Sequence, residues 1–97
     1  MSGITKKSNG VLTWSQENIL LAPSAKGVCV LRNLPTQNGI IYIEYTSDMK
    51  KTLQEKWDSD AMPEAEWFDW YQVESEQDGK RIASQWAEKF VPRYNAA

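Results

Sequence analysis

Side chains that could carry out catalysis are few in this chain of 97 residues. Histidine is absent, so the commonest general base and the commonest zinc ligand are both missing. The one cysteine, Cys29, could be a reactive thiol. Without histidine it lacks its usual activating base, and cysteine is often a small buried hydrophobe, so we expect Cys29 to be buried and unreactive.

Carboxylates concentrate between residues 55 and 78, where nine acids accompany a single base, Lys56. This stretch, with Glu64 and Glu66 at its centre, could bind a divalent cation. However, it lacks the spacing and the central glycine of a calcium loop. A solvated acidic face is the favoured interpretation, and we expect no metal ion and no other cofactor.

The overall charge also bears on the class of partner. The net charge is −2 and the sequence pI is about 5.1. Nucleic-acid binding draws most of its non-specific free energy from lysine and arginine, so this composition argues against it. A nucleic-acid surface stays possible if the bases of the first half gather on one side: Lys26, Arg32, Lys50, Lys51 and Lys56.

Cysteine usage and hydropathy favour a cytoplasmic protein. A single cysteine cannot form an internal disulfide, and the N-terminal residues do not resemble a signal peptide. The longest apolar runs, such as Ile19 to Ala22, are far shorter than the roughly 20 residues that cross a bilayer. We therefore expect no membrane association.

The pattern along the chain predicts one domain over residues 11–97. Residues 1–10 are polar and without apolar periodicity, which is typical of a disordered tail. Two β-branched, apolar runs, 27–32 and 40–45, flank an Asn-Gly turn signal and predict an antiparallel hairpin.

Capping residues and four-residue apolar spacing predict the helices. Ser15 can begin a short helix, Ser47 or Asp48 a second, and Ser75 a long third one that Pro92 ends. The aromatic run 66–73 is a third strand. The expected fold class is α+β, a small three-stranded antiparallel sheet packed with helices.

Three segments of this pattern resemble the signature of the GIY-YIG nucleases. They are residues 27–33, residues 42–53, and residues 90–95 with their closing Pro-x-Tyr-Asn. The resemblance covers about residues 22 to 95. It implies a GIY-YIG-like fold, and a cleavage site built from a tyrosine on each signature strand, an arginine and a His or Tyr on the first helix, and a metal-binding glutamate on the last.

Matching the chain to this pattern separates retained positions from replaced ones. Tyr42 could be part of a catalytic site, or an aromatic residue that packs across the hairpin, which we favour. The retained positions are Gly27, Tyr42 and Asn95. The replaced positions are Cys29 (first tyrosine), Glu44 (glycine), Thr52 (arginine), Lys56 (aromatic or His) and Ala83 (glutamate).

These replacements remove the arginine and the metal ligand that would stabilise charge on the phosphate. We therefore expect no catalytic residues and a chain that is not an enzyme. The leading hypothesis is a non-catalytic module that binds a protein partner through an acidic surface bearing Trp67 and Trp70. The alternative is a residual GIY-YIG-type DNA-binding or endonuclease domain.

Overall fold

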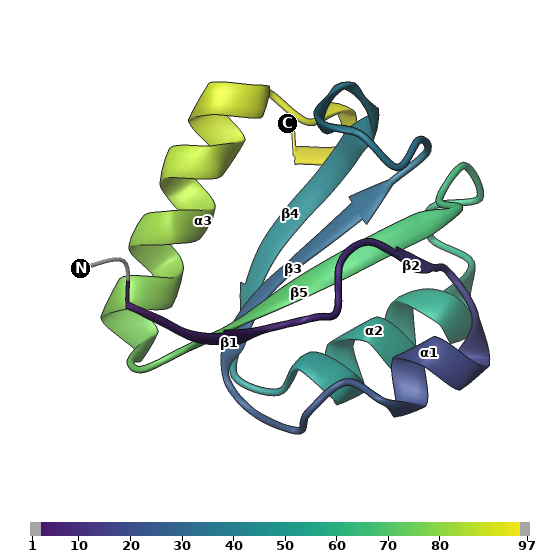
Figure 1. Cartoon of the computed structure of the whole chain (residues 1–97). Helices are drawn as coiled ribbons and strands as arrows, with labels where there is room; N and C mark the ends of the chain where they lie inside the picture. The colour runs from purple at the N-terminus through teal and green to yellow at the C-terminus, as the bar shows by residue number, and fades with distance from the viewer. Residues whose placement is uncertain (1–2, 96–97) are drawn as a thin grey trace.

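The central strand of the fold is β3 (Gly27–Arg32), and all six of its residues are buried. In this computed structural model, which describes residues 3–95, β3 lies between β4 (Ile40–Thr46) and β5 (Trp67–Val73) and pairs antiparallel with both (Figure 1). Cys29 is opposite Glu44 on β4 and Trp70 on β5. The predicted hairpin and third strand are confirmed.

The sheet is larger than predicted, because two N-terminal strands extend it to five. β1 (Ile4–Lys7) and β2 (Leu12–Thr13) both pair antiparallel with β5, and the main path runs β1-β5-β3-β4. The expectation of a disordered tail over residues 1–10 is therefore wrong for β1, and residues 1–2 lie outside the described residues. Pairing with β1 satisfies the backbone of β5 along its second edge, which would otherwise be open.

Helices cover both faces of the sheet, so the α+β class is confirmed. α1 (Gln16–Leu20) and α2 (Met49–Ser59) lie on one face, here called the α2 face, and α3 (Glu76–Phe90) lies on the other, the α3 face (Figure 1). None of the helices in the described part of the chain is long and apolar enough to span a membrane.

Each face of the sheet carries its own apolar core. On the α2 face, Cys29, Leu31 and Phe68 of the sheet pack with Met49 and Leu53 of α2. On the α3 face, the buried residues are Val28, Val30, Ile43, Val73 and Ile82. Alternate residues of β3 thus enter different cores, as the two-residue period of a strand requires.

Local signals fix the helix ends as the sequence indicates. The side chains of Ser15, Asp48 and Ser75 each accept a hydrogen bond from a backbone N–H in the first turn of α1, α2 and α3. After α3, Val91 adopts a left-handed conformation (φ 46°) immediately before Pro92. The Asn-Gly turn signal falls in a short 3-10 helix, η1 (Gln37–Gly39), between β3 and β4.

Arg32 and Asp69 form a buried ion pair on the α3 face of the sheet. The guanidinium donates two hydrogen bonds to the carboxylate, each 3.0 Å long, and a third to the Thr36 carbonyl. The Tyr71 hydroxyl also donates to Asp69. Arg32 and Asp69 are only 8% and 2% exposed, so each charge depends on the other for the solvation it has lost.

We predict that Asp69→Ala lowers the free energy of unfolding by about 3–5 kcal/mol, because it leaves the Arg32 charge buried and unpaired. Urea denaturation followed by circular dichroism would measure the change. Glu76→Ala, which breaks the exposed Lys80–Glu76 pair, is the control and should cost under about 1 kcal/mol. Equal losses in the two variants would contradict the buried-pair argument.

Candidate functional site

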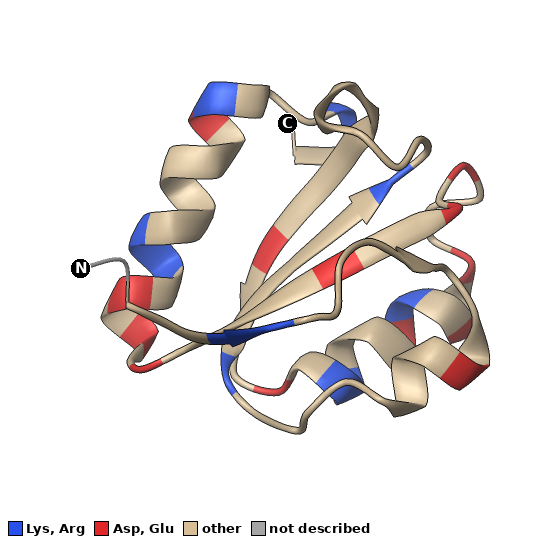
Figure 2. Cartoon of the chain, viewed as in Figure 1, with Lys and Arg blue, Asp and Glu red and all other residues tan. Residues whose placement is uncertain are grey.

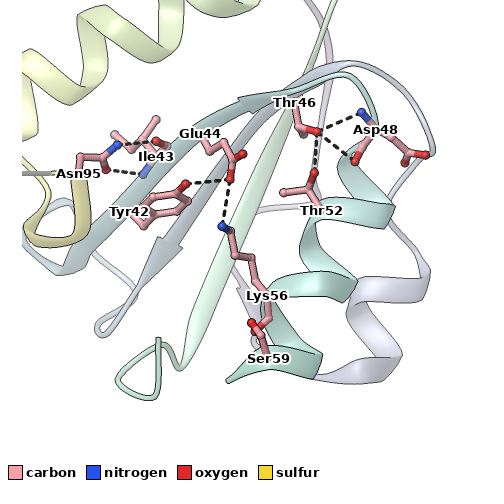
Figure 3. A network of polar contacts seen from close by, with 9 residues as sticks. All are labelled: Tyr42, Ile43, Glu44, Thr46, Asp48, Thr52, Lys56, Ser59 and Asn95. Atoms are coloured by element: carbon pink, nitrogen blue, oxygen red, sulfur yellow. Dashed lines mark hydrogen bonds and ion pairs between the residues drawn. The ribbon is translucent and has the colours of Figure 1, made fainter. Parts of the chain in front are cut away.

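Three polar side chains from β4 and α2 converge on the α2 face and form what we call the Tyr42 cluster. Tyr42 and Glu44 are two residues apart on β4 and so point to the same face. The Tyr42 hydroxyl donates a 2.9 Å hydrogen bond to Oε1 of Glu44. Lys56 Nζ, from the last turn of α2, lies 3.5 Å from the same oxygen and 5.0 Å from the centre of the Tyr42 ring (Figure 3).

The electrostatics of the cluster keep Tyr42 as a neutral phenol. Burial, followed by the hydrogen bond from Tyr42 to Glu44 and the charge of Glu44, raises the pKa of Tyr42 above its ordinary value near 10. Tyr42 is therefore a hydrogen-bond donor and not a base at neutral pH. The side chains of Lys56 and Glu44 are 27% and 32% exposed, so a ligand from solvent can reach both charges.

Cys29 is behind the cluster and cannot act as a nucleophile. It is 1% exposed, and burial, with smaller contributions from the charges of Glu44 and Asp69, raises the pKa of its thiol. The thiolate is the reactive form of cysteine, and this environment disfavours it. The expectation of a buried Cys29 is confirmed.

Two other replaced positions have structural contacts. The Thr52 hydroxyl lies 2.6 Å from that of Thr46, whose oxygen also accepts a hydrogen bond from the Asp48 N–H (Figure 3). These bonds fix the turn between β4 and α2. Ala83 packs against the core of the α3 face, whereas the Tyr42 cluster lies on the α2 face. A side chain at position 83 therefore starts from the face opposite to the cluster.

The retained residues Gly27 and Asn95 also have structural roles. A Cβ atom at Gly27 would overlap the sulfur of Met49 and the carbonyl oxygen of Tyr71, so only glycine permits this approach of α2 to β3. Asn95, in the short helix η2 (Arg93–Asn95), accepts a hydrogen bond from the Ile43 N–H and donates one to the Ile43 carbonyl, both 2.8 Å long (Figure 3). Asn95 thereby attaches the C-terminal segment to the edge strand β4.

The five bases proposed for a nucleic-acid surface do not gather in one patch. Arg32 lies at the end of the central strand, where it is buried and paired with Asp69. It cannot reach a phosphate, so the prediction is wrong for this residue. Lys50 and Lys51 lie in the first turn of α2, whereas Lys56 lies in its last turn (Figure 2). Lys26 is exposed at the start of β3.

Trp67 and Trp70, the predicted interaction surface, do not form one exposed patch. Trp70 is only 6% exposed and belongs to the core of the α2 face, and residues three apart in a strand point to opposite faces. Trp67 is half-buried at the start of β5. The exposed tryptophan is Trp57, at 37%. Its four-residue spacing from Met49 and Leu53 predicts a core position, so this prediction is wrong. It lies near the end of α2, where its ring packs edge to face against Trp14.

The geometry defines the fold as GIY-YIG-like, and comparison with solved structures agrees. The chain superposes on the GIY-YIG N-terminal endonuclease domain of UvrC from Thermotoga maritima. The match to its magnesium-bound form has a TM-score of 0.69 and 25% identity, over 84% of this chain and 94% of that one. A point mutant of the same domain, bound to the catalytic divalent cation, gives a TM-score of 0.72 and 22% identity over the same shares. No family model and no curated protein sequence matches the chain.

These matches correct one expectation. The replaced positions led us to expect a chain that is not an enzyme, but the structures it resembles are those of a catalytic endonuclease domain with its divalent cation bound. Position matching treats each replacement as a loss. In the structure, two of the replacements, Glu44 and Lys56, instead bring a carboxylate and an ammonium group to Tyr42.

We predict that the free energy of unfolding falls as the pH rises above about 10, and falls less steeply in Tyr42→Phe. The pKa of Tyr42 is raised by folding, so its contribution is complete below the unfolded value and is lost as the pH rises toward the folded value. Urea denaturation at a series of alkaline pH values would measure this. Identical pH dependences for wild type and Tyr42→Phe would contradict the burial of Tyr42.

We predict that Asn95→Ala lowers the free energy of unfolding by about 1–2 kcal/mol, because two hydrogen bonds to the backbone of Ile43 are lost. Asn95→Asp keeps the acceptor and loses the donor. Its stability should therefore be lower than that of wild type, whereas Glu88→Ala, at an exposed position of α3, should leave stability within about 0.5 kcal/mol of wild type. An unchanged stability in Asn95→Ala would contradict the attachment.

Proposed function

We propose that this chain binds nucleic acid and cleaves phosphodiester bonds as a GIY-YIG-type endonuclease domain, with the Tyr42 cluster as its phosphate site. The observation that carries the proposal is the convergence of Tyr42, Glu44 and Lys56 on one face of an edge strand. Tyr42 is also the position at which the family resemblance implies a catalytic tyrosine. The likeness to a catalytic endonuclease domain supports the same class of reaction.

In this proposal, Lys56 and Tyr42 provide the donors for the phosphate. An ammonium group is a compact charge that binds phosphate well, though without the paired donors of arginine. The Tyr42 phenol stays protonated, and can donate to a phosphate oxygen if a ligand displaces it from Glu44. Donors placed where charge develops in the transition state are usually the largest electrostatic contribution to such a reaction.

The resemblance also implies a divalent cation, and Glu44 is the residue that could hold it. Its hydrogen bond from Tyr42 and its ion pair with Lys56 both use Oε1, which leaves Oε2 for a metal. Mg²⁺ keeps several waters and needs only one or two carboxylates, so this donor fits. Within residues 3–95 there is no group of three His, Cys, Asp or Glu residues that could form a full cage. Such an ion would neutralise phosphate charge and acidify a bound water.

Exposed bases near the start of α2 complete the proposed contact with nucleic acid. Lys51 is exposed and Lys50 partly exposed on the helix that also carries Lys56, and Lys26 is exposed at the start of β3. Each lysine that neutralises a phosphate releases counterions, so affinity should fall steeply with salt. Since these charges are few, we expect weak binding that is detectable at low ionic strength.

The decisive experiment combines a gel shift with a cleavage assay on single- and double-stranded DNA, with Mg²⁺ or Mn²⁺. We predict that Lys56→Ala lowers the cleavage rate about 10²-fold, because one positioned donor to the phosphate is lost. Glu44→Gln should remove the cleavage that Mg²⁺ or Mn²⁺ supports, since the amide is a poor ligand. Lys80→Ala on α3, which removes an equal charge at an exposed site, is the control and should leave the rate unchanged.

Two results would count against the proposal. One is wild-type protein that neither binds DNA at low salt nor cleaves it with either metal. The other is cleavage that survives unchanged in Lys56→Ala and Glu44→Gln, which would point to a contaminating nuclease.

A further inference from the structure

An open pocket of about 590 Å³ lies on the α2 face, between the end of α2, β2 and the loop that precedes β5. Its walls include Trp14 and Trp57, its base includes the buried Met62, and Asp60 and Glu66 lie at its rim. We call it the Trp57 pocket. None of these residues takes part in the Tyr42 cluster.

The aromatic walls of the pocket are held in place by the core. Trp14 packs edge to face against Phe68, with ring centres 5.3 Å apart, and Phe68 is fully buried. Trp57 packs edge to face against Trp14 at 5.6 Å. Because Trp14 is fixed between two rings, Trp57 offers an exposed aromatic surface in a defined orientation. Because this aromatic surface is already ordered, the protein loses little conformational entropy when a ligand binds to it.

The charge around the pocket is strongly negative. Residues 57–66 contain four acids and no base. Asp60 and Glu66 are both exposed, whereas Glu64 is engaged with Arg93 and Tyr94. The helix dipole adds to this field, because the negative end of α2 points toward Asp60, the residue that caps it.

The neighbouring lysine does not neutralise this charge. Lys56 precedes Trp57, but consecutive residues of a helix point about 100° apart. Lys56 is turned away from Trp57 by this angle, toward β4, where it contacts Glu44 and Tyr42. The pocket thus combines an aromatic wall with uncompensated carboxylates, a combination that repels phosphate and attracts a cation.

We propose that the Trp57 pocket binds an arginine side chain presented by a basic segment of a partner protein. A guanidinium group is planar, so it can stack on the Trp57 indole while its N–H groups donate to Asp60 and Glu66. Tryptophan is the best aromatic partner for a cation, and arginine is enriched where protein partners bind most tightly. The acids at the rim speed the approach of a basic segment and disfavour acidic ones.

This inference is independent of the proposed nuclease activity, since it uses different residues and a different ligand. It also differs from the surface expected at Trp67 and Trp70. Both sites lie on the last turns of α2, about 100° apart around the helix axis.

The test titrates the full chain, labelled with ¹⁵N, with a tetra-arginine peptide blocked at both ends. The indole N–H signals are assigned with Trp14→Phe and Trp57→Phe. We expect saturable shifts of the Trp14 and Trp57 signals, and binding that weakens as NaCl is added. The matched peptide of four citrullines, which keeps the shape of arginine and removes its charge, should cause no such shifts.

Paired variants separate the pocket from general attraction between opposite charges. Asp60→Asn with Glu66→Gln should weaken binding on the order of tenfold, since both carboxylate partners of the guanidinium are lost. Glu74→Gln with Glu88→Gln removes the same charge from exposed positions elsewhere and should change the affinity little. The dispersion of the remaining amide signals reports that each variant is folded.

Three outcomes would overturn the proposal. The first is equal affinity in the two double variants, which would mean only non-specific attraction. The second is binding of the citrulline peptide as tight as that of tetra-arginine. The third is the absence of shifts at Trp14 and Trp57, whether or not DNA cleavage is observed in the separate assay.

Discussion

Burial of β3 on both faces is the constraint on which the rest of the structure depends. β4 and β5 pair with both edges of this strand, and an apolar core covers each face. A polar side chain on it therefore needs a hydrogen-bond or ion-pair partner inside the protein. Arg32 meets that condition through Asp69. Cys29 meets it by being a small thiol that stays protonated. A charged or reactive side chain on β3 would need polar partners from the protein, because water does not reach it. Polar side chains that solvent can reach, such as Tyr42 and Glu44, therefore lie on the edge strand β4.

On β4 the two faces of the strand have different surroundings, and the side chains on them have different roles. Ile43 contributes to the α3 core, and Asn95 bonds both its N–H and its carbonyl, so at this residue the edge of β4 is not open to another chain. Tyr42 and Glu44 point to the other face, where α2 covers them only in part. α2 then positions side chains for both proposed sites, because Lys56 contacts Glu44 of β4 while Trp57, about 100° further round the helix, lines the pocket.

Sequence patterns predicted those parts of the fold whose signals are local. The caps at Ser15, Asp48 and Ser75 and the hairpin between β3 and β4 each depend on a few neighbouring residues. β1 escaped prediction because it is an edge strand with exposed side chains, so it has no apolar alternation, and its partner β5 lies more than sixty residues away. The role of Trp57 was missed for a similar reason. Spacing places a residue on a helix face but does not say how far the sheet extends beneath that face.

The candidate site shows the same limit in a sharper form. Matching to the family pattern assigned Tyr42 as a retained position and Glu44 and Lys56 as replaced ones, and each replacement taken alone implies a lost function. Whether the side chains at two replaced positions contact each other depends on the register of the strand and the rotation of the helix. A sequence pattern gives neither of these. In the structure, Glu44 places a half-buried carboxylate beside the Tyr42 hydroxyl. The ammonium group of Lys56 balances the negative charge of that carboxylate. Glu44 and Lys56 are therefore one feature of this site, because the attraction between these two half-buried charges offsets part of the desolvation cost that each one carries.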